Sequence, residues 1–193
     1  MARKKYEFRP DKPKTSFLSK LYLTQKQRQS LLKWGLYGFC LLILSLLQDV
    51  VLCKMDFFGA TTDLVPCAIL LICVLVGTES GSVFTLVASA LFVFSGTAPG
   101  EYAMALITVL GVGAAMFRQS FLRSGFSATM LCTAVAYGLY EMVVFFIGLF
   151  MGLTTFDRIF GFVITAGLTF ITAPILYPVF RVIGKIGGES WKE

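Results

Sequence analysis

The sequence contains no histidine, and only 15% of its residues are charged. A chain without histidine lacks the commonest general base and the commonest metal ligand. Its cysteines form no CxxC pair or other metal-ligand spacing, so we expect reduced packing residues at Cys40, Cys53, Cys67, Cys73 and Cys132. Closely paired carboxylates, a phosphate-cradling glycine loop and a nucleophile elbow are also absent. We therefore expect a protein that is not an enzyme and has neither a metal nor a cofactor.

Apolar residues, in contrast, are abundant. They make up 56% of the chain, and the mean hydropathy is +0.78. A soluble fold cannot bury that much apolar surface. The sequence predicts an all-α membrane protein whose transmembrane domain, residues 31–185, has six spans near Leu31–Cys53, Leu64–Val76, Val83–Phe94, Ala103–Phe117, Ala128–Leu153 and Ile159–Ile183.

The distribution of lysine and arginine supports six spans. With both termini on one side, that side receives ten basic residues up to Lys33, Arg118 and Arg123 from a loop, and three from the tail, so that only Lys54 and Arg158 lie opposite. A five-span arrangement, with residues 64–94 as one element, divides the basic residues about eleven to six. Because basic loops stay in the cytoplasm, we expect six spans and cytoplasmic N and C termini.

The second and third apolar runs are short. Thirteen or twelve helical residues cover about 20 Å, whereas the hydrocarbon core of a bilayer measures about 30 Å. We expect the flanks to lengthen these helices, to about residues 59–78 and 80–97, with a tight turn at residues 78–81. The second to fourth helices should then be shorter than the others and more enclosed by protein.

Two cytoplasmic segments flank the expected transmembrane domain. Residues 1–30 form a basic leader with an amphipathic stretch around Phe17, Leu18, Leu21 and Tyr22, and residues 186–193 form a short tail. The leader's charges fix the orientation of the protein, bind the anionic inner leaflet, or dock a cytoplasmic partner. We expect no nucleic-acid binding, because no stacking aromatics alternate with the charges.

Glu141 is the most unusual side chain of the chain, because it lies midway along the fifth apolar run. A carboxylate there is costly unless it is paired, solvated or protonated. The candidate polar site comprises Glu141, Tyr137 one helical turn away, and Gln48. We weigh a neutral carboxyl that bonds within the bundle against a proton or ion relay, a ligand contact and a bond to a partner. The other acids, including Asp63, we interpret as interface residues.

Gly148 and Gly152 form a GxxxG pattern near the end of the same run. Small residues let helix backbones approach closely in lipid. They serve either the internal fold or the docking of a partner's single transmembrane helix.

Several short motifs between Leu31 and Lys185 resemble the rod shape-determining protein MreD family. They are Leu46-Leu47-Gln48, Phe58-Gly59-Ala60-Thr61-Thr62-Asp63-Leu64, Ser95-Gly96-Thr97-Ala98-Pro99-Gly100, the basic turn from Arg118 to Arg123, Glu141, and Leu176-Tyr177-Pro178-Val179-Phe180-Arg181. The chain departs from that family at Phe92, where an aspartate is common, and at Thr62, where a proline is common. No role of the aspartate is carried over.

The resemblance implies a membrane scaffold or regulator of bacterial cell shape and peptidoglycan elongation. Such proteins act with the bitopic protein MreC, and indirectly with the actin-like MreB filament and a glycosyltransferase with its penicillin-binding partner. The family is also similar to the compact six-helix S components of energy-coupling-factor vitamin transporters, which supply the alternative function. A vitamin binder needs a cavity with convergent polar groups, whereas a scaffold needs an apolar face of small residues open to lipid.

Overall fold

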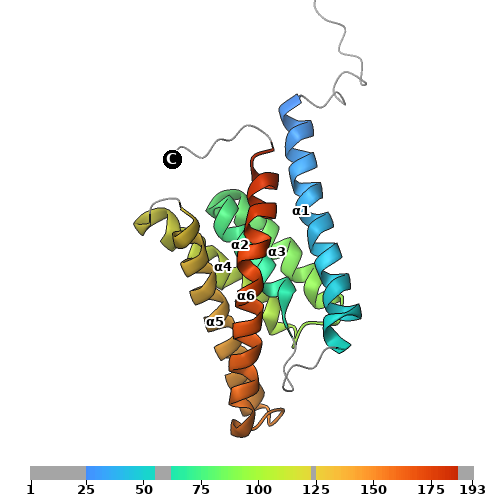
Figure 1. The fold of residues 1–193 in the computed structure, drawn as a ribbon, viewed down its shortest axis with the longest axis vertical. Coiled ribbons are helices and arrows are strands. Elements are labelled where there is room, and N and C mark those ends of the chain that lie inside the picture. Colours follow the sequence, from blue (N-terminus) through green and yellow to red (C-terminus); the bar gives the residue numbers. More distant parts are fainter. Residues whose placement is uncertain (1–24, 55–61, 123–124, 187–193) are drawn as a thin grey trace, which may run out of the picture.

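The computed structural model describes residues 25–54, 62–122 and 125–186. These residues form six α-helices, two short 3-10 helices and no strand (Figure 1). In chain order the elements are α1 (Gln25–Val50), η2 (Leu52–Lys54), α2 (Leu64–Val76), α3 (Thr78–Phe94), α4 (Tyr102–Phe121), α5 (Phe126–Phe150), η3 (Phe156–Arg158) and α6 (Ile159–Gly184). The expected number of helices is therefore found. The amphipathic part of the leader lies outside the described residues, and α1 begins before the predicted domain boundary at residue 31.

Four helices are long and apolar enough to cross a membrane, namely α1, α4, α5 and α6. Large apolar side chains are exposed along them, as in Phe39, Val109, Leu131 and Val163. A surface of this kind is expected where lipid covers the protein. These features indicate a membrane protein. The helices α2 and α3 are shorter, with 13 and 17 residues, as the sequence predicts.

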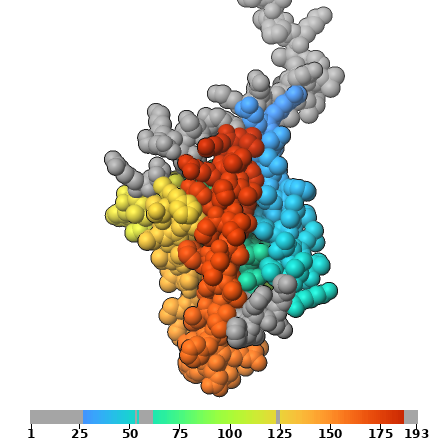
Figure 2. Space-filling model, viewed as in Figure 1, coloured from blue at the N-terminus to red at the C-terminus, as the bar shows by residue number. Residues whose placement is uncertain are grey.

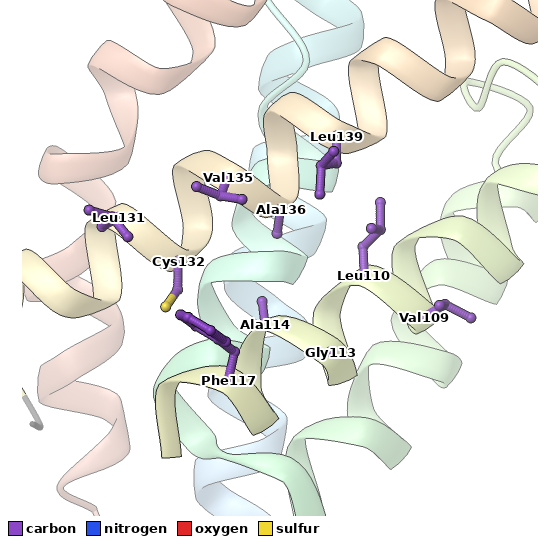
Figure 3. Close-up of a pocket in the computed structure, with 10 residues that line it drawn as sticks. All are labelled: Val109, Leu110, Gly113, Ala114, Phe117, Leu131, Cys132, Val135, Ala136 and Leu139. Atoms are coloured by element: carbon purple, nitrogen blue, oxygen red, sulfur yellow. The ribbon is translucent and has the colours of Figure 1, made fainter. Parts of the chain in front are cut away.

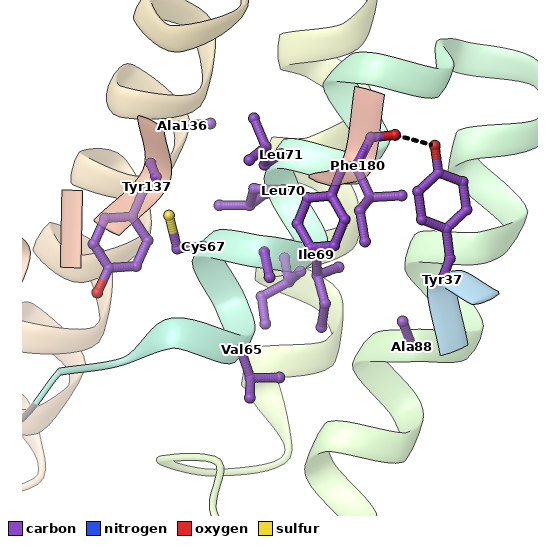
Figure 4. Packing of buried hydrophobic residues seen from close by; sticks show 14 of the residues in the cluster. Tyr37, Val65, Cys67, Ile69, Leu70, Leu71, Ala88, Ala136, Tyr137 and Phe180 are labelled. Carbon is purple, nitrogen blue, oxygen red and sulfur yellow. Dashed lines mark hydrogen bonds between the residues drawn. The ribbon is translucent and has the colours of Figure 1, made fainter. Parts of the chain in front are cut away.

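The helix α2 occupies the centre of the bundle. It contacts each of the other five helices, and twelve of its thirteen residues are buried. Its side chains meet Tyr137 and Ala136 of α5 on one side, and Phe180 of α6 and Tyr37 of α1 on another (Figure 4). The Tyr37 hydroxyl donates a hydrogen bond of 3.1 Å to the carbonyl oxygen of Phe180. The centre of the bundle is thus a helix enclosed by protein.

The expected order of enclosure is wrong for one helix, α5, whereas α4 is more enclosed than α1 and α6 as expected. The spanning segment of α5 is 44% buried, against 22% for that of α4, although the sequence predicts a more enclosed fourth helix. Both helices pack against three others, α5 against α2, α4 and α6, and α4 against α2, α3 and α5.

The turn between α2 and α3 is also tighter than expected. It consists of Gly77, and residues 78–81 belong to the first turn of α3. Gly77 adopts φ 97, a conformation that side chains disfavour, and its amide donates to the carbonyl oxygen of Cys73 at 2.9 Å. Nor is α2 lengthened at its start, because the described Thr62 and Asp63 are not helical. A glycine in the left-handed region makes the longer turn unnecessary.

Successive helices run in alternating directions, so α1 begins and α6 ends at the same end of the bundle (Figure 1). Arg28 and Lys185 lie at that end, whereas Lys54 and Arg158 lie at the opposite end, in η2 and η3. The α5–η3–α6 hairpin extends beyond the other helices at this opposite end (Figure 2). Its tip exposes the apolar side chains of Phe150, Met151, Leu153, Phe156 and Phe160.

Candidate functional site

Tyr137 and Glu141 form a buried hydrogen-bonded pair on α5. The Tyr137 hydroxyl donates to Oε1 of Glu141 at 2.6 Å, and the two side chains are 1% and 6% exposed. Residues four apart on a helix lie on one face. Here that face interacts with Cys67 of α2 and Thr169 of α6. The structure thus places these two predicted site residues together inside the bundle.

Gln48, the third predicted site residue, serves a different element. Its Oε1 accepts a 3.0 Å hydrogen bond from the backbone amide of Val65, and its Nε2 donates to Oδ1 of Asp63 at 3.4 Å. The first amides of a helix have no partner within the helix. Gln48 of α1 therefore caps the start of α2 and has no hydrogen bond to Glu141 among those found in the described residues.

Thr169 of α6 connects the two halves of this site. Its hydroxyl accepts a 3.0 Å hydrogen bond from the backbone amide of Asp63, and its side chain also interacts with Tyr137. The Asp63 carboxyl in turn interacts electrostatically with Glu141. One polar cluster therefore joins α1, α2, α5 and α6, and it comprises Gln48, Asp63, Tyr137, Tyr140, Glu141 and Thr169.

Tyr140 completes the polar cluster. Its side chain is 1% exposed, and its hydroxyl has no hydrogen-bond partner within the described part of the chain. It interacts electrostatically with both Asp63 and Glu141. A buried hydroxyl without a partner costs free energy, so a polar atom of this kind requires an explanation.

The other end of α2 is closed by Arg118, from the last turn of α4. Its guanidinium donates to the carbonyl oxygens of Val74 and Leu75, and its side chain is 8% exposed. The sequence predicts that Arg118 lies in a loop, and this prediction is wrong. The residue belongs to α4, and its side chain is buried. The guanidinium is buried because the last carbonyls of α2 lack partners within the helix.

A groove lies between α4 and α5, with a volume of about 360 Å³ (Figure 3). Small residues line part of it, and several of its larger residues are well exposed, including Val109 and Leu131. A side chain added at Gly113 would meet no atom within 4 Å. The lining consists of Val109, Leu110, Gly113, Ala114, Phe117, Leu131, Cys132, Val135, Ala136 and Leu139. The groove is thus apolar and open, with unoccupied space beside Gly113.

Gly148 and Gly152 do not form one helical face. Helix α5 ends at Phe150, and Gly152 adopts φ 70 beyond it. The amide of Gly152 donates to the carbonyl of Leu149, and that of Leu153 to the carbonyl of Gly148 at 2.9 Å. This pair of bonds is a Schellman cap, in which glycine is favoured. The positive φ at the end of α5 explains why residue 152 is a glycine. Docking of a partner's transmembrane helix at Gly148 stays a prediction.

Within the described ranges, no three His, Cys, Asp or Glu side chains are grouped as metal ligands. Cys40, Cys67, Cys73 and Cys132 are free thiols there. Comparison of the chain with family models, with curated proteins and with solved structures finds no match.

Sequence reasoning missed Asp63, Thr169 and Arg118. One signal was available for Asp63, because an aspartate directly before an apolar helical run occupies the position that caps a helix. No local pattern identifies Thr169 and Arg118, since their partners are 106 and 44 residues away.

Proposed function

We propose that this protein is a non-enzymatic membrane scaffold of the MreD kind, which takes part in bacterial cell-shape determination and peptidoglycan elongation. Its partners are a bitopic MreC-like protein and, indirectly, the MreB filament and a glycosyltransferase/penicillin-binding protein pair. It resides in the plasma membrane as a multi-pass protein with cytoplasmic N and C termini, and its bundle is similar to that of energy-coupling-factor S components. The sequence resemblance and the positive-inside rule support this proposal.

The α4–α5 groove is the observation that carries the scaffold function. Its side chains are apolar apart from the Cys132 thiol, and the space beside Gly113 is open. A vitamin site needs convergent polar groups, which this groove does not offer. A transmembrane helix, in contrast, is apolar and packs against small residues. The groove therefore suits a partner helix better than a polar ligand.

This docking face differs from the one that the GxxxG pattern suggests. Ala114 of α4 faces Ala136 of α5 across the groove (Figure 3), and Gly113 is also part of its lining. The close approach of backbones at such positions provides the van der Waals packing that holds helices together in lipid. We propose that the transmembrane helix of the bitopic partner lies in this groove, against both α4 and α5.

Co-purification from the native membrane tests this function. Recovery of a bitopic protein with a large extracytoplasmic domain is expected for the wild type. Gly113→Leu should fill the groove and reduce recovery at least tenfold, whereas Gly167→Leu, at an exposed glycine of α6 with open space around it, should not. Recovery of an ATPase pair instead would favour the transporter alternative.

A thermal-shift assay with a panel of vitamins provides a second test. A ligand at 100 times its dissociation constant stabilises the folded state by about 2.7 kcal/mol. We expect no vitamin to shift the unfolding temperature. A saturable shift with any one vitamin would contradict the scaffold function.

A further inference from the structure

Two carboxyl groups of the polar cluster, one from α5 and one directly before α2, interact electrostatically. Glu141 is 6% exposed, and Asp63 is partly buried beneath Gln48 and Thr169. Each carboxyl accepts a hydrogen bond from a neutral donor: Tyr137 bonds Glu141, and Gln48 bonds Asp63. Neutral donors stabilise a carboxylate but do not compensate its charge.

The groups that surround the two carboxyls include no cation within the described part of the chain. Besides Asp63 itself, α2 contributes Cys67, which interacts with Glu141. The other titratable neighbours are Tyr137 and Tyr140 of α5 and Tyr102 of α4, while α1 and α6 contribute the neutral side chains of Gln48 and Thr169. All of these titratable groups are neutral or negative, so none balances the charge of an ionised carboxyl.

Two negative charges in such a place are unfavourable. A single carboxylate within the membrane costs several kcal/mol, and two neighbouring carboxylates repel each other strongly in a medium of low dielectric constant. Like-charged carboxyls that share a site usually retain a proton between them, and membrane proteins use similar oxygen clusters to hold cations. The arrangement therefore requires a positive charge that the described side chains do not supply.

Two buried polar atoms at or next to residues of the polar cluster have no hydrogen-bond partner within the described ranges. They are the Tyr140 hydroxyl, on a side chain that is 1% exposed, and Oγ1 of Thr62, which directly precedes Asp63. The Tyr140 hydroxyl interacts with both carboxyls. These two oxygens are available to a bound ion, or to water that accompanies a bound proton.

We propose that Asp63 and Glu141 together bind one monovalent cation, a proton or a sodium ion, which completes the polar cluster and holds α2 against α5. The bound charge neutralises one carboxylate, and the remaining negative charge is stabilised by the Tyr137 and Gln48 donors. This site is independent of the proposed docking groove, because the groove lies between α4 and α5 and includes no residue of the polar cluster.

Thermal unfolding of the full-length protein in detergent tests the proposal, at pH 5 to 9, in sodium chloride or in N-methylglucamine chloride of equal ionic strength. Without sodium, we expect the unfolding temperature to fall as the pH rises, because the folded state binds a proton that it loses at high pH. If sodium raises the unfolding temperature at high pH, sodium is a ligand of the site. If the unfolding temperature falls with pH equally in the presence of sodium, the proton is the only ligand.

Three variants locate the effect. Asp63→Asn and Glu141→Gln should each flatten the dependence on pH or sodium, and the double variant should abolish it, because it has no negative charge to neutralise. Asp157→Asn, at an exposed acid in η3, should behave like the wild type. If the single variants do not fold, infrared difference spectra of the wild-type protein between pH 5 and 9 provide the test instead. The spectra should show the carbonyl stretch of a protonated carboxyl, and this band should disappear at high pH or with sodium.

Two results would overturn the proposal. One is a wild-type protein whose unfolding temperature and infrared spectrum change with neither pH nor sodium. The other is a dependence that persists unchanged in the double variant. Because no partner protein takes part in these measurements, they are independent of the scaffold function.

Discussion

The guanidinium of Arg118 donates a hydrogen bond to the backbone carbonyl oxygen of Val74, in the last turn of α2. All but one of the 13 residues of α2 are buried by neighbouring helices. Its terminal amides and carbonyls must therefore find partners among neighbouring side chains. Gln48 and Arg118 provide these partners at opposite ends, which explains how so short a helix is stable at the centre of the bundle.

The first prediction concerns Arg118. Arg118→Ala leaves buried carbonyls unpaired and should reduce the free energy of unfolding by about 1–3 kcal/mol. Arg118→Lys retains the charge but not the forked geometry and should lose less. Arg158→Ala, at an exposed arginine of η3, should change stability by less than about 0.5 kcal/mol. Denaturation in detergent measures all three, and an equal loss at both arginines would refute the capping role.

The second prediction concerns Glu141. Glu141→Gln keeps an acceptor for the Tyr137 hydroxyl, so the variant should fold and function nearly normally. Glu141→Leu removes that acceptor and the polar group, and should weaken whichever association depends on the carboxyl by about 0.6 kcal/mol and at most about 2. Complementation of a deletion strain and thermal stability are the measurements. Loss of function in Glu141→Gln with normal expression and stability would indicate a proton or ion relay.

The third prediction concerns the contact between α2 and α3. A Cβ added at Gly81 would lie 3.0 Å from the carbonyl oxygen of Cys73, and backbone atoms cannot move aside easily. Gly81→Ala should therefore destabilise the protein by about 1–3 kcal/mol. Gly138→Ala, at an exposed helical glycine of α5 with nothing within 4 Å, should be neutral or stabilising. Similar unfolding temperatures for both variants would argue against this packing.

The fourth prediction is topological. A cysteine that replaces Lys185, after α6, should be protected in intact cells from a reagent that does not cross the membrane. A cysteine that replaces Arg158, in η3 at the opposite end of the bundle, should react. Both are introduced into a cysteine-free background. Labelling at residue 185 and protection at residue 158 would reverse the proposed orientation.

The sequence predicts the helices well because hydropathy alone determines their places. The run Leu64–Val76 coincides with α2, and the last run differs from α6 by one residue. The start of α3 was predicted too late, because residues 78–81 look like a turn, although Gly77 alone makes that turn. The local sequence pattern does not show that a single glycine is enough to form the turn between α2 and α3.

The candidate site was only partly predictable. Tyr137 and Glu141 are four residues apart on one helix, so their contact follows from helical geometry. Asp63 reaches the same cluster only because α2 packs between α1, α5 and α6. Arg118 was interpreted from its charge as a loop residue, and its burial follows from the position of the end of α2. Contacts of this kind depend on the three-dimensional arrangement and leave no periodic signal.

Site-specific photo-cross-linking in native membranes tests the proposed docking groove most directly. A photoreactive residue at position 131 lines the groove (Figure 3). One at position 163 occupies a similarly exposed apolar site on α6. We predict that position 131 cross-links to the transmembrane helix of a bitopic protein with a large extracytoplasmic domain, and that position 163 does not. Cross-linking of that protein from position 163 alone, or of an ATPase-associated subunit from position 131, would contradict the account.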